Sequence, residues 1–168
     1  MLAIRKGDET AFEQLMGRHI DALYRYALRL SGSQATADDL TQDTWLTVWA
    51  KTHRFKPSKA SLKTWLFRVL HNKFVDGVRK NRLVTDATIP ETTGPELSDV
   101  DEQARAQARL FREIGELPEQ QRAAILLAHA QGFGNKEVAQ ILGTSVRATE
   151  SLLARARRTL KDKIGENI

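Results

Sequence analysis

The chain has 168 residues, of which 41% are hydrophobic and 28% charged, and it carries a formal net charge of +5 with a pI near 9.7. This balance fits a soluble globular protein of one medium or two small domains and excludes general disorder. The sequence has no cysteine, and its four histidines show no ligand-like spacing, so we expect no metal and no cofactor. No run approaches the ~20 apolar residues of a membrane span and the start lacks a secretion signal, so we expect a cytoplasmic protein.

The charges are unevenly distributed along the chain. Residues 51–82 carry ten basic side chains and one acidic, and residues 122–168 carry eight and four. Between them, residues 83–121 carry three basic and nine acidic side chains. Two basic segments separated by an acidic one predict two surfaces that bind one polyanion.

The first expected helix begins at a capping Asp8 and ends at Ser31, Gly32 and Ser33. Its apolar positions form one stripe, which we interpret as core: Phe12, Leu15, Met16, Leu23, Ala27 and Leu30. His19 lies on or near this stripe and is interpreted as a packed core residue without a catalytic role.

A second helix is expected from a capping box formed by Thr36 and Asp39, with Leu40, Thr44 and Val48 facing the core. Its other positions have two interpretations. Acidic residues in a first turn stabilise the helix dipole and tryptophans are usually core residues, whereas an acidic face bordered by tryptophan is also typical of a protein docking surface. The pattern alone leaves both open.

Residues 55–61 form an expected basic loop, and the following helix, residues 62–82, carries a mixed stripe on its outer side. Trp65, Arg68, Asn72, Asp76 and Arg79 follow one another at helical spacing. Aromatic, amide and guanidinium groups beside a basic loop are typical of single-stranded DNA binding, although Trp65 could equally be a core residue.

Residues 83–103 are rich in proline, threonine and acids, and we expect a linker there. A second domain is then expected, with a helix near 104–115 and another that starts at Leu117, Pro118 and Glu119. Two more helices are expected around a turn at Gly143, the second capped by Thr144 or Ser145. On that second helix Val146, Thr149, Leu153, Ala156 and Leu160 should pack inward, while Arg147, Ser151, Arg155 and Arg158 share an outward arc, as in a helix that enters a DNA major groove. The alternative is a solvated basic face.

Several segments, in this order, resemble the extracytoplasmic-function (ECF, group 4) sigma factors of the bacterial sigma-70 family. They are GDETAFEQLMGRH, DDLTQDTWLTVW, FKPSKASLKTWLFRVLHNKFVD with the basic RKNR, LPEQQRAAILL, and GFGNKEVAQILGTSVRATESLLARARRTL. The resemblance implies an all-α protein with two domains: region 2 over residues 1–82, a linker over 83–103, and region 4 with a helix-turn-helix over 104–168. We expect no further sensing domain after Ile168.

The resemblance also implies partners and site residues. The partners are core RNA polymerase, through its β′ clamp coiled coil and β flap, promoter DNA, and an anti-sigma factor. The implied polymerase-binding residues are Asp38, Asp39, Gln42, Asp43, Trp45 and Trp49. The implied minus-10 residues are Lys56, Ser58, Lys59, Ser61, Trp65, Arg68, Asn72, Lys73, Arg79 and Lys80. The implied minus-35 residues are Arg147, Thr149, Glu150, Ser151, Arg155 and Arg158.

The function implied is promoter-specific transcription initiation, for a stress or envelope-signal regulon, without catalytic chemistry. A stand-alone dimeric helix-turn-helix regulator is the alternative; it would require a self-complementary interface and a palindromic site. A nuclease or hydrolase that uses His129 or the carboxylates has little support, because no acid pair or metal cluster occurs at a workable spacing.

Overall fold

The computed structural model describes residues 2–84 and 102–165, and within these ranges every regular element is helical, which confirms the all-α prediction. The N-terminal part comprises α1 (Leu2–Arg5), α2 (Glu9–Ser31), α3 (Gln34–Ala50), the short 3-10 helix η1 (Thr52–Arg54) and α4 (Leu62–Val84). The C-terminal part comprises α5 (Glu102–Gly115), α6 (Glu119–Ile125), the π-helical η2 (Leu126–Ala130), α7 (Asn135–Leu142) and α8 (Val146–Gly165). Most of the expected linker, residues 85–101, lies outside the described residues. None of the described helices is both long and apolar enough to cross a bilayer.

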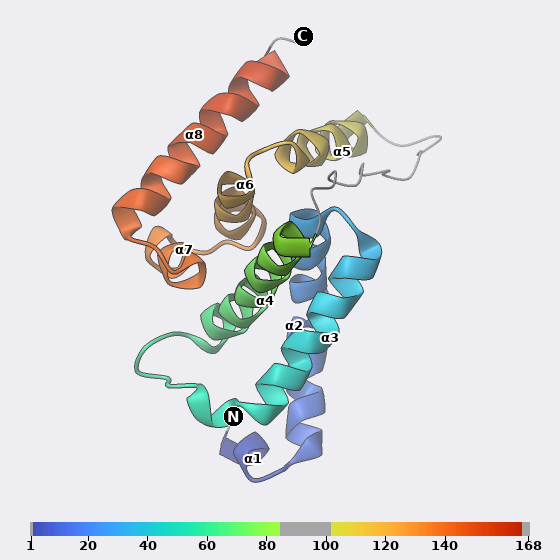
Figure 1. Ribbon diagram of the computed structural model, residues 1–168, viewed down its shortest axis with the longest axis vertical. Coiled ribbons are helices and arrows are strands. Elements are labelled where there is room, and N and C mark those ends of the chain that lie inside the picture. Colours follow the sequence, from blue (N-terminus) through green and yellow to red (C-terminus); the bar gives the residue numbers. More distant parts are fainter. Residues whose placement is uncertain (1, 85–101, 166–168) are drawn as a thin grey trace.

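The N-terminal domain is a bundle of α2, α3 and α4 (Figure 1). Its core is formed by fully buried side chains from all three helices: Leu23, Tyr26, Ala27, Leu30, Val48, Leu66, Phe67 and Leu70. The carboxylate of Asp8 accepts a hydrogen bond from the backbone N–H of Ala11 at 2.9 Å, which confirms the expected cap of α2. Gly32, with a φ of 70°, ends this helix.

The expected cap of α3 at Thr36 is wrong. Ser33 is the N-cap, and its hydroxyl accepts a hydrogen bond from the backbone N–H of Thr36. The chain turns at once after the left-handed Gly32, so the next hydroxyl along the chain caps α3 and the helix begins earlier than expected. The predicted inward face is confirmed, because Leu40, Thr44 and Val48 are all buried.

The C-terminal domain packs α8 across α5, α6 and α7 (Figure 1). Gly143 has a φ of 66° and ends α7, as expected, and the hydroxyl of Ser145 accepts from the backbone N–H of Ala148, so Ser145 caps α8. Leu153 and Ala156 are buried as expected, whereas Val146, the first residue of α8, is 37% exposed. The helix-turn-helix expected over these residues is therefore confirmed as a local structure.

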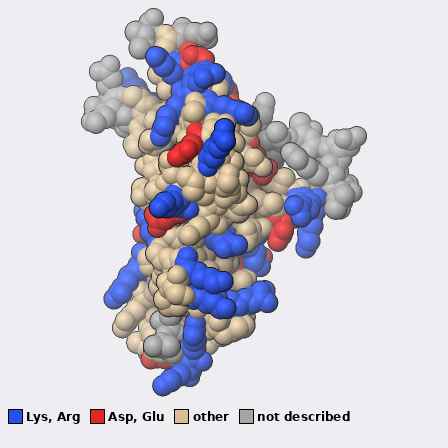
Figure 2. Space-filling model, turned by 90° about the vertical axis from the view of Figure 1, so that its left-hand side faces the viewer, with Lys and Arg blue, Asp and Glu red and all other residues tan. Residues whose placement is uncertain are grey.

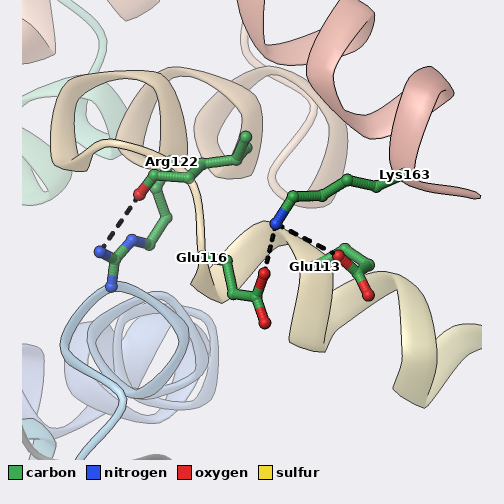
Figure 3. Close-up of polar contacts among 5 residues, drawn as sticks. Glu113, Glu116, Arg122 and Lys163 are labelled. Carbon is green, nitrogen blue, oxygen red and sulfur yellow. Dashed lines mark hydrogen bonds and ion pairs between the residues drawn. The ribbon is translucent and has the colours of Figure 1, made fainter.

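A polar contact holds α8 against the end of α5. The ammonium group of Lys163 donates to the carboxylate of Glu116 and lies 3.5 Å from that of Glu113 (Figure 3). The Lys163 ammonium lowers the pKa of the Glu116 carboxyl below its ordinary value. Because these groups are near the surface, solvent screens the attraction and its contribution to stability is small.

The two domains contact each other where α7 lies along α4. The rings of Phe67 in α4 and Phe133, just before α7, pack edge to face with centroids 5.0 Å apart. The ammonium of Lys63 donates to the backbone carbonyl of Gln131 at 2.7 Å and lies 4.5 Å from the Phe133 ring centroid. This contact joins a cation of the basic segment 51–82 to the other domain.

Two further polar contacts cross the same boundary. The hydroxyl of Thr64 donates to the carboxylate of Glu137 at 2.9 Å. The Arg122 guanidinium donates to the backbone carbonyl of Leu30 at 3.0 Å and so connects α6 with the end of α2. The buried apolar residues of the two domains also form one continuous core.

Candidate nucleic-acid interface

The outer face of α8 is polar and accessible. Arg147, Ser151, Arg155 and Arg158 are all exposed, and Glu150 is exposed beside them. The three-residue and four-residue steps along Arg147, Ser151, Arg155 and Arg158 place these side chains opposite Leu153, Ala156 and Leu160, which face the core. The face has the cations and hydrogen-bond donors that phosphates and base edges require.

Thr149 does not belong to this face. Its side chain is fully buried, which confirms the inward packing expected from its position and leaves no accessible Thr149 side chain to support its assignment to minus-35 DNA. The two expectations for Thr149 conflicted, and helical periodicity decides between them because position 149 falls on the arc of Leu153 and Leu160.

The loop before α4 presents a second basic surface. Its side chains Lys56, Ser58 and Lys59 are exposed. At the end of the loop, the hydroxyl of Ser61 accepts from the backbone N–H of Thr64 at 3.1 Å and caps α4. The helix therefore starts at a fixed point, and three hydroxyl or ammonium groups project into solvent in front of it.

Trp65 lies one turn into α4 and is half-buried. Its ring packs against that of Phe55 with centroids 5.4 Å apart. One part of the ring is supported by Phe55 and another is accessible, which is compatible with packing against the loop and with stacking of a base.

Further along α4, Arg68, Asn72, Arg79 and Lys80 are exposed. Asn72, Asp76 and Arg79 line a polar cleft of about 310 Å³ that α7 borders through Leu142. Lys73 differs from the others, since its ammonium lies 3.5 Å from the carboxylate of Asp43 on α3. The stripe expected on the outer side of this helix is thus accessible, with Lys73 at its boundary to α3.

The basic surfaces occur on one side of the molecule. Figure 2 views the side on which α7, α8 and the loop before α4 lie, and Lys and Arg side chains extend over it from end to end with few acidic groups between them. A face of this kind attracts a polyanion over its whole length.

The acidic side chains of α3 divide into two arcs. Asp38 and Gln42 line the groove between α3 and α2 together with Leu46, which is 60% exposed, whereas Asp39 and Asp43 lie outside this lining. All four polar side chains are exposed, so this helix presents an anionic surface with an apolar residue in it.

The two tryptophans of α3 differ in depth. Trp45 is 5% exposed and packs edge to face on Phe12 with centroids 5.8 Å apart; Trp49 is 39% exposed and 4.9 Å from the same ring. Trp45 is therefore a core residue that also forms the floor of the groove, and Trp49 is the more accessible of the two.

The groove between α2 and α3 has a volume of about 670 Å³ and is mostly apolar. Phe12, Met16 and Ile20 line it from α2, and Asp21 and Asp38 stand at its rim. From the sequence, Phe12 and Met16 were expected only as core residues. A signal was present: the apolar stripe of α2 continues from Leu23 to Phe12, about three turns toward the N-terminus at 3.6 residues per turn, and so offers more apolar surface than one neighbouring helix covers.

Beneath α4, a buried hydrogen bond connects it with α2. The hydroxyl of Tyr26 lies 3.2 Å from Nδ1 of His71, and both side chains are buried. Burial lowers the pKa of His71 to about 4 and raises that of Tyr26, because a charge on either ring would lose its hydration. The helix that carries Trp65 and Arg68 is therefore positioned by a neutral polar pair.

Two sigma-70 family descriptions match this chain: sigma-70 region 2 over residues 15–84 and sigma-70 region 4 over residues 107–160. The ECF RNA polymerase sigma factor RpoE of Cereibacter sphaeroides is 37% identical over 166 residues, which cover 96% of this chain and 91% of that protein. The ECF sigma factor SigE of Mycolicibacterium smegmatis is 30% identical, and this chain spans only 65% of its length.

Solved structures agree with these matches. The sigma factor RpoE of Bartonella quintana, in complex with the anti-sigma factor NepR, has a TM-score of 0.77 at 30% identity and covers 94% of this chain and 99% of its own. The structure of CnrH in complex with the cytosolic domain of CnrY has a TM-score of 0.74 at 28% identity, and the match covers 99% of this chain and 96% of the CnrH chain.

The fold and its surfaces thus define a two-domain helical transcription factor. The chain belongs to the ECF sigma factors of the sigma-70 family, a family of transcription initiation factors. These relatives favour the sigma factor over the stand-alone dimeric regulator considered from sequence.

Proposed function

We propose that this sigma factor divides its work among three surfaces and contributes no catalytic chemistry. Residues 1–82 bind core polymerase through α3 and the minus-10 element through the basic loop and α4. Residues 104–168 read the minus-35 element through α8, and residues 83–103 link the two. The observation that supports this division is the pattern of charge: one exposed anionic helix, and two exposed cationic surfaces that share a side of the molecule.

Polymerase binding is assigned to α3. Asp38, Asp39, Gln42 and Asp43 are exposed, and Trp49 adds an accessible ring at the end of the same helix. Carboxylates that surround an aromatic anchor suit a partner with basic side chains around an apolar centre. We propose that this partner is the β′ clamp coiled coil of the polymerase and that region 4 binds the β flap.

Strand separation at the minus-10 element is assigned to the loop and α4. Lys56 and Lys59 hold phosphates, and Trp65 stacks on an exposed base, an interaction that contributes about 1 to 3 kcal/mol per base. Unpairing costs a few kcal/mol for each base that leaves the stack. A small number of such contacts therefore offsets the opening of a short segment of duplex.

Regulation by an anti-sigma factor is part of the proposal, with a stress or envelope-signal regulon as the output. Two solved relatives were determined with such a partner, NepR in one case and CnrY in the other. In this chain the groove between α2 and α3 supplies an apolar surface with Leu46 exposed in it and carboxylates at its rim.

Transcription in vitro tests the function. Core polymerase with the full chain should initiate from a subset of fragments of its own genome, and permanganate should modify unpaired thymines upstream of each start. Core polymerase alone is the control. Failure to initiate from any fragment, with the chain folded, would reject the proposal. In gel filtration the chain should elute together with core polymerase. Elution as a dimer without polymerase would instead support the stand-alone dimeric regulator.

Affinity capture from the native cell tests regulation. Leu46→Asp places a charge in the groove and should reduce recovery of an inhibitor protein relative to the unaltered chain. Leu110→Asp is the matched control, because Leu110 is 37% exposed on α5, outside the groove. Equal recovery of every partner by the two variants would remove the groove from the proposal.

A further inference from the structure

The side chain of Arg5 connects the N-terminal turn with the start of the basic loop. Its Nε donates to the backbone carbonyl of Thr52 at 3.2 Å, and its Nη2 donates to that of Phe55 at 2.5 Å. These acceptors are 47 and 50 residues away in sequence. Thr52 is the first residue of η1 and Phe55 directly follows it, and through this short helix the chain leaves α3 and enters the loop 56–61.

The two carbonyls lie where the backbone leaves the core. Thr52 and Phe55 are buried, and the Phe55 ring packs against Trp65. The next residue, Lys56, is exposed, as are Ser58 and Lys59. Arg5 therefore holds the last anchored point before the loop, and a guanidinium fork that binds two carbonyls fixes both the position and the direction of the backbone there.

The other end of the loop has its own anchor. The hydroxyl of Ser61 bonds the backbone N–H and the hydroxyl of Thr64 within the first turn of α4. With both ends held, the geometry of the five residues between them depends on where each anchor is placed. Arg5 is the distant side chain that holds the start of the loop; within the loop, the side-chain amide of Gln140 on α7 donates to the backbone carbonyl of Lys59 at 3.5 Å.

The helix that carries Arg5 has this contact and little else. α1 has four residues, too few to be stable alone, and Ile4 is its buried side chain among those described. The chain then turns at Gly7, with a φ of 83°, and enters α2 at its cap. The turn at Gly7 and the burial of Ile4 place the Arg5 side chain beside η1.

We infer that Arg5 is a positioning residue for minus-10 recognition: it sets the start of the loop 56–61, so that the loop and Trp65 meet the displaced strand in one geometry. The inference rests on the proposed assignment of this loop to the minus-10 element. The Arg5 guanidinium bonds backbone carbonyls, so this role does not require a contact of Arg5 with DNA.

The test uses the full chain with core polymerase on a promoter identified with the unaltered protein, and on the same promoter with one minus-10 base changed. The variants are Arg5→Ala, Arg5→Lys and the control Lys6→Ala, which removes the same charge from the adjacent exposed residue. The measured quantity is the ratio of open-complex formation on the two promoters, followed by permanganate reactivity. Melting temperature and affinity for core polymerase are measured in parallel.

Arg5→Ala should reduce this ratio by about tenfold, the value of one charge-assisted hydrogen bond, with polymerase affinity unchanged. Arg5→Lys should recover part of it, because an ammonium can bond one carbonyl but lacks the fork, and Lys6→Ala should leave it unchanged. A lower melting temperature with an unaltered ratio would overturn the inference and make Arg5 a stabilising contact only. No opening by the unaltered protein would reject the proposed function, a result that no variant could imitate.

Discussion

The buried pair of Tyr26 and His71 predicts that acid destabilises the N-terminal domain. The His71 imidazole has an ordinary pKa of 6.5, and burial lowers its pKa to about 4 in the folded protein. Above pH 6.5 the ring is neutral in both states and the full stability is present. As the pH falls from 6.5 to about 4, the unfolded chain binds a proton that the folded chain does not, so stability is lost.

The magnitude follows from these two values. Complete loss would amount to about 3.4 kcal/mol, at about 1.36 kcal/mol for each pH unit that separates the two pKa values. Between pH 7 and pH 5 the free energy of unfolding should fall by about 2 kcal/mol from this group alone. That is a large part of the margin of about 5 to 15 kcal/mol that typical domains have.

Urea unfolding at pH 7 and pH 5 measures the effect, with His71→Asn as the comparison. Asparagine leaves Tyr26 a hydrogen-bond partner and does not titrate. All other titrating groups act in both proteins, so they cancel when the two pH-dependent losses are subtracted. The unaltered protein should lose about 2 kcal/mol more than the variant. Equal losses in the two proteins would refute the argument that the buried imidazole is neutral because of its burial.

Three further predictions concern the proposed surfaces. Trp65→Ala should reduce open-complex formation, measured by permanganate, with little change in affinity for core polymerase; Asp43→Ala should do the reverse, and parallel losses would contradict separate roles. Arg155→Ala should weaken binding to minus-35 duplex by about 1 to 3 kcal/mol in fluorescence anisotropy if it bonds a base, whereas Arg157→Ala, which removes the same charge from a residue bonded to His129, should weaken it less. Trp45→Ala should lower the free energy of unfolding by about 3 to 5 kcal/mol in urea titrations because Trp45 is buried, and a smaller loss than that of Trp65→Ala would contradict its place in the core.

Features that depend on neighbouring residues were predictable from the sequence. Periodicity identified the buried positions Leu40, Thr44 and Val48, and the glycine at position 143 identified the turn of the helix-turn-helix, because both signals are carried within a few residues. The cap of α3 was misplaced by three residues since two hydroxyls, on Ser33 and Thr36, were both suitable, and the choice depends on how α2 ends.

Contacts between distant segments were not predictable. Arg5 and its two carbonyl acceptors lie about fifty residues apart, and Thr64 and Glu137 lie 73 apart, so no spacing links them. The different depths of Trp45 and Trp49 follow from the position of the Phe12 ring on another helix. The resemblance assigned roles to whole elements, while the exposure and contacts of each side chain in them depend on packing that only the fold reveals.

The contact of Lys63 with the C-terminal domain has a consequence for the salt dependence of promoter binding. While α7 lies along α4, the Lys63 ammonium donates to the Gln131 carbonyl and lies over the Phe133 ring, so this cation is not available to a phosphate. Separation of α7 from α4 would release it, and its binding to DNA would displace one more counterion. The logarithm of promoter affinity should then fall more steeply with the logarithm of salt concentration, by about one charge, than in a Lys63→Met variant.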